Sequence, residues 1–510
     1  MAALSRCPLH DLADELLVGI VAQVGSKKDL CSLAVTCSRL QAFAEPRIYE
    51  DYLVRHGSHV LRILDCVAKR PERALAIRAL HIQYPSRDRA GITFLNPVMR
   101  QMLNLRELTI EAPCCNDPSN LMLSEYFHHE GKIQYADYFT WASEMVRETT
   151  PMSTQLRVRV PLQTFTLHSH MASLRDRRTG QIQGRDAFNM GKNAAIFLHP
   201  TLRNLTISCF DINEDIAPIL SPKYGSTPLK SLTFDECNIK VEGLAAILSV
   251  PKALERLTLG ERMHCLEGYL HSPLGTNPAP FLDALALQEH SLQFIKHIGG
   301  HTPFPAHHSR KLSMANFTQI TKMELDLHSA LANILSETAP PWSLTAPPNL
   351  HLRLIRCTSA STKEKTTPQR MLEWLRRVPE LDYILENDVI PRNHAVTELW
   401  YCEACTETWA EIAEFLAPQG QPQISTDQRR LRVFVLESTG FIPPYMLGEP
   451  RPVETLLYDS SVHGHDGYGA TLYLPGTGDF LVPYGWTRLK DDLEPGTQIH
   501  LIGSNRCQSW

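Results

Sequence analysis

The sequence lacks a strong excess of charge of either sign. Lysine and arginine total 50, aspartate and glutamate total 55, and the formal net charge is −5 over 510 residues. Proteins that bind nucleic acid or an anionic membrane usually carry a concentrated basic surface. The composition therefore disfavours nucleic acid and membranes as main ligands.

Long apolar runs are also missing. No run reaches the roughly 18 apolar residues that a membrane-spanning helix needs, and the start, MAALSRCPLHDLADELL, has no basic segment followed by a long apolar one. The 13 cysteines are odd in number and scattered from Cys7 to Cys507, which fits reduced, mostly buried thiols better than a disulfide framework. We therefore expect a protein of the cytoplasm, the nucleus or both.

Motifs of catalysis are missing too. The sequence has no G-x-S-x-G elbow, P-loop, dinucleotide fingerprint, zincin helix or kinase set. Its C-x-x-C pair, Cys402 and Cys405, has no second pair at the spacing of a zinc site, so core or turn cysteines are the simpler interpretation. No enzyme activity, cofactor or metal is predicted. A hydrolytic or redox activity in the glycine-rich tail stays open.

What the sequence does have is an ordinary globular composition, 43% hydrophobic, and a front end of three predicted short helices. The first has apolar residues at three- and four-residue spacing: Leu16, Leu17, Ile20, Val21 and Val24. Ser26 with Asp29 is a capping pair that opens the second. Ser38 with Gln41 opens the third, which should end near Pro46 because the residue before proline avoids the helical region. Some 40 residues bury little surface, so this part should lean on the next domain or on a partner.

The stretch LKSLTFDECNI, followed by KVEGLAAIL, has the order L-x-x-L-x-L-x-x-C-x-I and then a helix, which is the pattern of a leucine-rich repeat. Alternate residues of its short strand point into the core, and the helix returns on the other side. The template also fits elsewhere, with starts at Ile77, Leu105, Leu162, Leu202, Leu229, Leu254, Leu282, Ile320, Asn349, Val396, Leu431 and Val453. The starts from Leu202 to Leu282 lie 27, 25 and 28 residues apart.

These patterns predict an α/β chain with a short all-helical unit at residues 1–50, a helical linker or cap at 51–76, and a leucine-rich-repeat solenoid with irregular insertions at 77–460. Residues 461–510 are rich in glycine and aromatics, which predicts short strands that cap the solenoid. In such a horseshoe, the second and fourth residues after each start face outward on the concave sheet. This row is polar with mixed signs, which favours a protein or peptide partner. The interface candidates in it are Arg256, Lys322, Arg353 and Trp400.

The front helices resemble an F-box, in Leu12, Asp14-Glu15-Leu16-Leu17, Asp29-Leu30 and Cys37-Ser38-Arg39-Leu40. Ala13 stands where the family usually has proline, and Thr36 where it usually has valine. Together with the repeats, and with LAVTCSRLQAFAEPRIYEDYLVR followed by IRALHI, the chain resembles the F-box/leucine-rich-repeat receptors of SCF-type cullin–RING ubiquitin ligases, especially fungal members.

The resemblance implies a non-catalytic receptor that docks on a Skp-type adaptor and cullin while the concave face holds an unknown protein substrate. Adaptor contacts would then fall on Leu12, Leu16, Leu17, Ile20, Leu30, Leu33, Cys37 and Leu40. The alternative is a leucine-rich interaction protein or regulator outside any ligase, in which the front helices serve only as a cap.

Overall fold

The computed structural model divides the chain into two compact units. Unit 1 comprises Met1–His170, Lys192–Ile207 and Ser226–Leu229, and unit 2 comprises Met171–Gly191, Ser208–Gly225 and Lys230–Trp510. The structure describes residues 11–83, 95–111, 143, 161–168, 188–208, 210–235, 237–261, 274–275, 278–298, 312–326, 329–336, 346–348, 350–357, 374, 378, 380–387, 430–437, 453–459, 472–474 and 479–481.

Unit 1 opens with three helices, α1 (Asp14–Ala22), α2 (Lys27–Ala34) and α3 (Ser38–Ile48). Their shared core consists of Leu17, Val21, Leu30, Leu40 and Ala44. The Ser26 hydroxyl accepts the Asp29 N–H at 3.4 Å and caps α2, which confirms the predicted helix start.

The third helix departs from the prediction at both ends. Its cap is Cys37, whose Sγ accepts the Leu40 N–H, and not Ser38. The helix also continues through Pro46 to Ile48. Tertiary contacts hold this last turn, because Arg47 donates to the carbonyl of Ala22 at 2.6 Å and Ile48 packs against the core. These contacts outweigh the hydrogen bond that a proline removes.

The rest of unit 1 alternates strands and helices. After α3 come β1 (Asp51–Val54), α4 (Gly57–Lys69), α5 (Glu72–Ala76), β2 (Ala79–Gln83), α6 (Leu95–Met99), β3 (Glu107–Glu111), β4 (Thr164–His168), η4 (Gly191–Leu198) and β6 (Asn204–Ser208). Strands β1 to β4 pair side by side and parallel. The segment 51–76 was predicted to be helical. It is helical only in part, because its first four residues form a strand.

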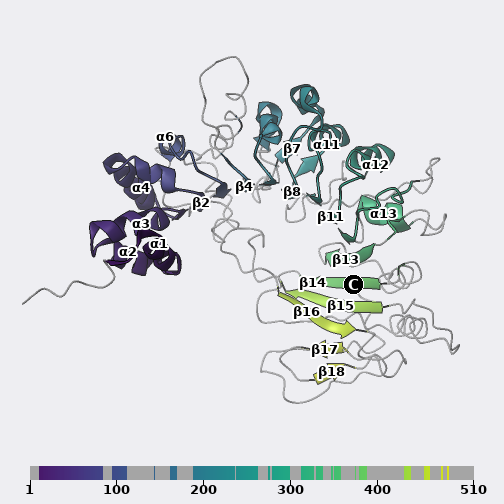
Figure 1. The fold of residues 1–510 in the computed structure, drawn as a ribbon. Coiled ribbons are helices and arrows are strands. Elements are labelled where there is room, and N and C mark those ends of the chain that lie inside the picture. Colours follow the sequence, from purple (N-terminus) through teal and green to yellow (C-terminus); the bar gives the residue numbers. More distant parts are fainter. Residues whose placement is uncertain are drawn as a thin grey trace, which may run out of the picture. The chain divides into compact units, whose positions relative to one another are not determined.

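Unit 2 is also mixed α/β. Its elements are β5 (Phe188–Asn189), β7 (Phe210–Ile212), η5 (Glu214–Ile216), α10 (Ala217–Leu220), η6 (Ser221–Lys223), β8 (Ser231–Asp235), β9 (Asn238–Ile239), α11 (Val241–Leu248), β10 (Arg256–Gly260), α12 (Pro278–Ala286), β11 (Phe294–Ile298), β12 (Lys322–Asp326), α13 (Ala330–Ser336), β13 (His351–Cys357), β14 (Glu380–Asn387), β15 (Arg430–Glu437), β16 (Val453–Asp459), β17 (Leu472–Leu474) and β18 (Asp479–Leu481). The main sheet runs β8-β10-β11-β12-β13-β14-β15-β16, and α11, α12 and α13 lie on one side of it (Figure 1).

One local pattern recurs in both units. The carbonyl just before several of the strands accepts the N–H groups of two consecutive residues at the start of the next strand, as that of Lys230 does from Glu255 and Arg256. The carbonyl of Arg78 does the same for Arg106 and Glu107 in unit 1. Residues predicted to point inward are buried in many of the described strands, for example Leu232, Phe234, Leu257 and Leu259. Some residues predicted to face outward, such as Thr109 and Glu324, are buried as well, so the predicted alternation holds only in part.

Three predicted strand starts are wrong. Leu282 lies buried on α12, because Phe281, Leu282 and Leu285 also have helical spacing, and the strand of this segment is β11, which begins twelve residues later. Leu431 is the fourth position of its strand unit, since it pairs with Leu381 on β14, a strand that the template missed. At Val453, β16 runs antiparallel to β15 and so does not continue the parallel array.

The structure bears on only some of the predictions for the C-terminal part of the chain. The antiparallel pair β17 and β18 confirms short strands after residue 461, and a capping role for them stays a prediction. The start at Val396, Trp400 and the Cys402/Cys405 pair lie outside the described residues. Cys31, Cys37, Cys66 and Cys237 form no disulfide, and of these Cys237 is buried whereas Cys31 is exposed. Among the described helices, none combines the length and the apolar character needed to cross a bilayer.

Candidate interaction surfaces

Three of the predicted adaptor contacts lie in the core of the front helices. Leu17, Leu30 and Leu40 are 1%, 3% and 5% exposed. Their side chains are already used in packing α1, α2 and α3 against one another, so they hold the helices in place and offer almost no surface to a partner. Leu12, Leu33 and Cys37 are half-buried and pack against the same core.

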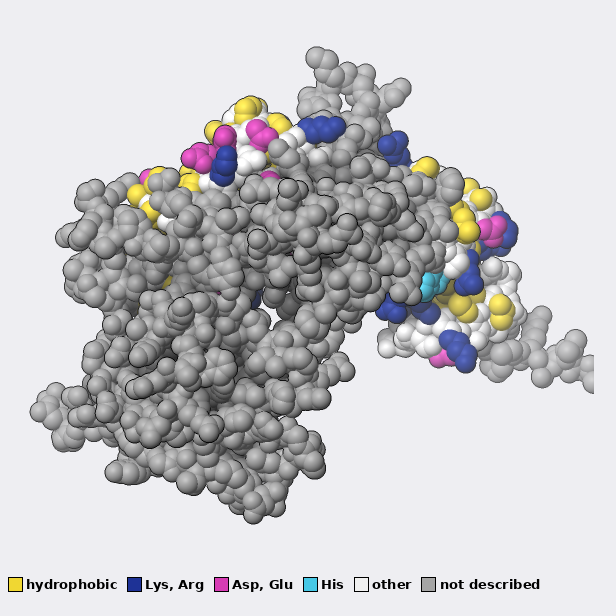
Figure 2. Space-filling model, turned by 180° about the vertical axis from the view of Figure 1, so that it is seen from behind, with side chains coloured by type: hydrophobic (Ala, Val, Ile, Leu, Met, Phe, Trp, Pro, Cys, Tyr) yellow, Lys and Arg dark blue, Asp and Glu magenta, His cyan; other side chains and the backbone are white. Residues whose placement is uncertain are grey.

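Leu16 and Ile20 are the predicted contacts that face solvent, with 57% and 42% exposed. They lie four residues apart on α1 and therefore share one side of the helix. Gly19 lies on the same side, and a Cβ built there meets nothing within 4 Å. We call Leu16, Gly19 and Ile20 the α1 face. The space-filling view shows hydrophobic side chains exposed among charged ones at this end of unit 1 (Figure 2).

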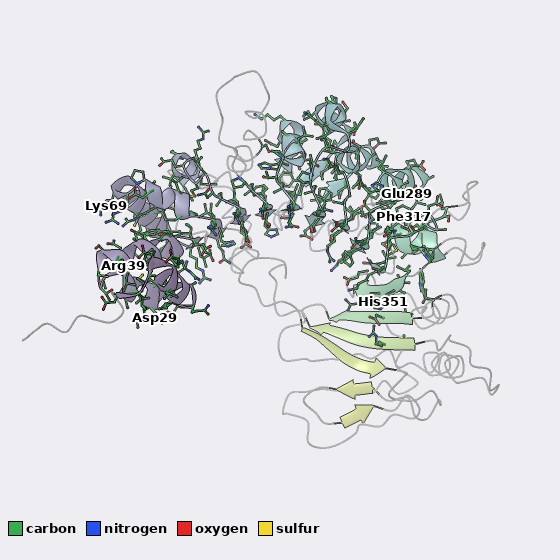
Figure 3. The ribbon with its side chains drawn as sticks, in the orientation of Figure 1. Asp29, Arg39, Lys69, Glu289, Phe317 and His351 are labelled. Atoms are coloured by element: carbon green, nitrogen blue, oxygen red, sulfur yellow. The ribbon has the colours of Figure 1, made fainter. Side chains whose placement is uncertain are left out.

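Ion pairs brace the helices that carry the α1 face. Arg39, which Figure 3 labels, donates through Nε to Asp14 Oδ1 at 2.9 Å and through Nη2 to the carbonyl of Leu12 at 2.6 Å. Glu45 on α3 accepts from Arg70 at 2.8 Å and from Arg73 Nε at 2.6 Å. The front helices therefore lean on α5 and the segment before it, as their small core predicts.

The second surface is a row of side chains on the strands of unit 2, which we call the charged row. Strand register places Lys296, Glu324 and Arg353 side by side on β11, β12 and β13. Asp382 and Arg432 continue the line on β14 and β15. Basic and acidic residues thus alternate across five neighbouring strands. A second line beside it contains Arg256, Phe294, Lys322 and His351.

One carboxylate at the centre of the charged row is shared by three cations. Glu324 lies 2.8 Å from Lys322 Nζ, 2.9 Å from Arg353 Nη1 and 3.7 Å from Lys296 Nζ. Burial by itself raises the pKa of Glu324, but Lys296, Lys322 and Arg353 outweigh it and the pKa is lowered. Glu324 therefore stays ionised at neutral pH.

A second carboxylate is held in the same way. Asp382 accepts from Arg432 Nε at 2.7 Å and Nη2 at 3.0 Å, and its Oδ2 lies 3.1 Å from His351 Nε2. Burial raises the pKa of Asp382, and the contacts with His351 and Arg432 lower it further than burial raises it. Figure 3 labels His351 on this part of the sheet.

Phe294 organises the cations of the second line. The Arg256 guanidinium lies 4.3 Å from the centre of its ring and the Lys322 ammonium 5.7 Å from it. Cations are attracted to the face of an aromatic ring at these distances. The ring therefore holds two long basic side chains, from the strands on either side of it, in defined positions.

The chain gives no match to protein-family models or to curated proteins with which it was compared.

The predicted interface residues differ in how far they are exposed. Arg256 is exposed and Lys322 half-buried, so both present charge to solvent. Arg353 is not an exposed contact, since it is 8% exposed and engaged with Glu324 and with Asp382 at 3.6 Å. The sequence reasoning missed Lys296 and Phe294 because it assigned the strand to Leu282, although Leu292 and Ile295 keep the first two apolar positions of the template.

Unit 2 contains a buried imidazole–carboxylate pair, a combination of groups that can act in acid–base catalysis. His297 Nε2 lies 2.8 Å from Glu261 Oε2, and the His297 ring meets Phe281 edge-on. The two side chains are 0% and 4% exposed, so this imidazole–carboxylate pair is closed to a substrate and packs as part of the core. Within the described part of the chain, no group of three or more His, Cys, Asp or Glu residues is arranged to hold a metal ion.

Proposed function

We propose that the protein is the substrate-recognition subunit of an SCF-type cullin–RING ubiquitin ligase. In this proposal the front helices are an F-box that docks on a Skp-type adaptor through the α1 face. The strands and helices that follow are a leucine-rich-repeat solenoid that holds a protein substrate. The chain itself has no catalytic role and supplies proximity between the substrate and the transfer machinery.

The observation that carries the proposal is the α1 face. Leu17 and Val21 are the α1 side chains buried in the core, whereas Leu16 and Ile20 are exposed and are not needed for packing within the chain. Exposed neighbouring apolar side chains mark interaction sites more often than isolated ones do. Val35, in the turn between α2 and α3, adds a side chain that is 84% exposed.

The departure at Ala13 is compatible with the F-box resemblance. Ala13 precedes α1 with φ −62° and ψ 152°. A proline ring fixes φ near this value. Alanine therefore keeps the backbone path that the family's proline would impose.

Two features support the solenoid part. The same pair of N–H to carbonyl bonds recurs between successive strands, and α11 brings Leu244, Ile247 and Leu248 into the core as the repeat pattern predicts. Such a stack covers the apolar side of each unit with its neighbour.

A pair of matched glycine substitutions tests the adaptor site. Gly19→Glu places a charge on the α1 face, and a Cβ at Gly19 meets nothing within 4 Å. Gly25→Glu makes the same change in the loop before α2, where a Cβ also meets nothing. We expect the full chain to co-purify with a Skp-type adaptor and cullin, Gly19→Glu to abolish this, and Gly25→Glu to retain it.

A second variant keeps the test independent of the introduced charge. Leu16→Ala with Ile20→Ala should weaken adaptor binding by about 30-fold, since each truncation removes about 1 kcal/mol of apolar contact. Unchanged binding in both variants would refute the docking site. A folded full chain that never binds the adaptor, yet captures a partner that is not ubiquitinated, would favour the non-ligase interaction protein.

A further inference from the structure

The charged row of unit 2 and the second line beside it present positive charge to solvent and keep their negative charge underneath. The side chains of Lys322 and Lys296 are 38% and 33% exposed, whereas those of Glu324 and Asp382 are 11% and 5% exposed. A ligand that approaches this part of the sheet therefore meets ammonium and guanidinium groups first.

The charged row and the second line together carry more cations than their carboxylates can neutralise. Of the residues named in these two lines, Glu324 and Asp382 are the carboxylates, and the basic side chains are Arg256, Lys296, Lys322, Arg353 and Arg432. The excess is three positive charges before any contribution from His351, in a chain whose formal net charge is −5. Such a local excess raises the concentration of an oppositely charged segment near the surface.

The positions of these cations are defined before a ligand binds. Arg256 and Lys322 share the ring of Phe294, and Lys322 and Lys296 share the carboxylate of Glu324. Side chains that are already held lose less rotamer freedom on binding than free lysines and arginines do.

We propose that Arg256, Lys296 and Lys322 bind an acidic segment of a protein, extended across the strands, through its carboxylate or phosphate groups. The identification of this segment as part of a ubiquitin-ligase substrate rests on the proposed function. The charge complementarity between the segment and the surface is independent of it. Arg256 and Lys322 lie two strands apart, about 9.6 Å at ~4.8 Å per strand. A peptide in the polyproline II conformation rises about 3.1 Å per residue with three residues per turn, so acidic groups three residues apart lie on one side of it at about 9.3 Å, which matches this distance.

Fluorescence anisotropy with the full chain, without adaptor, tests the proposal. The probes are a labelled peptide of Gly and Ser with Glu at every third position, the same peptide with phosphoserine in place of Glu, its Gln counterpart and a single-stranded oligonucleotide of equal charge. We expect the Glu or the phosphoserine peptide to bind, and the tighter of the two identifies carboxylate or phosphate as the preferred group. The Gln peptide should not bind, and binding should weaken as salt screens the exposed charges.

Variants locate the binding. Arg256→Gln with Lys322→Gln should weaken the anionic peptide at least about tenfold. The charge-conserving pair Arg256→Lys with Lys322→Arg should retain binding within about threefold, which would attribute the loss in the Gln pair to the removed charge. Lys252→Gln, an exposed lysine outside the row, should change it less than twofold.

Absence of binding by both anionic peptides would overturn the proposal, as would an equal loss in Lys252→Gln. Tighter binding of the oligonucleotide than of either peptide would overturn the choice of a protein segment. Gly19→Glu separates this proposal from the ligase assignment, because it should lose the adaptor and keep the peptide.

Discussion

Gln288 is a buried amide that ties together two successive turns of unit 2. Its Nε2 donates to the carbonyls of Leu248 at 2.8 Å and Pro251 at 3.0 Å. Its Oε1 accepts the Leu254 N–H at 2.8 Å and the Ser291 hydroxyl at 3.0 Å. The side chain is 2% exposed. All three backbone partners belong to the connection that begins at the end of α11 and leads into β10.

Gln288→Leu keeps nearly the same volume and removes these four hydrogen bonds. Two carbonyls and one N–H of the backbone then lose this partner in a buried place, at about 1 to 3 kcal/mol for each group. We expect the free energy of opening of this region to fall by about 3 to 9 kcal/mol. The loss of stability comes from the backbone groups left without a partner, because burying the leucine side chain is itself favourable in an apolar interior.

Hydrogen exchange measured by mass spectrometry on the full chain reports this loss locally. A fall of about 3 kcal/mol accelerates exchange of the β10 amides by about 100-fold, as each 1.4 kcal/mol is tenfold. Glu289→Leu is the control, since it makes the same replacement one residue along, at the partly exposed side chain labelled in Figure 3, and should change exchange by less than about threefold. A Gln288→Leu effect below about 1 kcal/mol, or equal to that of Glu289→Leu, would refute the reasoning.

Two further predictions concern unit 1. Leu17→Ala should accelerate exchange across α1 to α3 by about 30-fold or more, since truncating a core leucine costs about 2 to 5 kcal/mol. Leu16→Ala, at its exposed neighbour, should change exchange little. Similar exchange in both variants would contradict the packing described for α1. Burial lowers the pKa of His199 to about 4. An unfolded histidine titrates near 6.5, so the unfolded chain binds the proton first as the pH falls. The stability linked to this group is complete above about pH 6.5 and is lost between 6.5 and 4. Around η4 and β6, exchange corrected for its intrinsic pH dependence should report about 2 kcal/mol less stability at pH 5 than at pH 7, and His199→Gln should remove this share; a pH response that is identical in the variant would refute it.

Most strand positions were predictable because their signal is local. The order L-x-x-L-x-L places two apolar residues on the same side of a short strand. Leu232 and Phe234 are such a pair and are buried, as are their counterparts Leu257 and Leu259. The same holds for the Ser26 cap, whose donor lies three residues away. The template failed at Leu282, where an apolar triplet satisfies helical and strand spacing alike, and only packing against its neighbours decides between them.

The sequence by itself determined the α/β character, most strand starts before Leu282 and the three front helices, because propensity, capping and periodicity act over a few residues. Only the tertiary structure decided which leucines of α1 face solvent, that α3 continues past Pro46, and that five strands align Lys296, Glu324, Arg353, Asp382 and Arg432 in one row. Burial and ion pairing depend on register between residues that lie far apart in the chain. Arg353 and Glu324 are 29 residues apart and meet at 2.9 Å, a contact that no local pattern encodes.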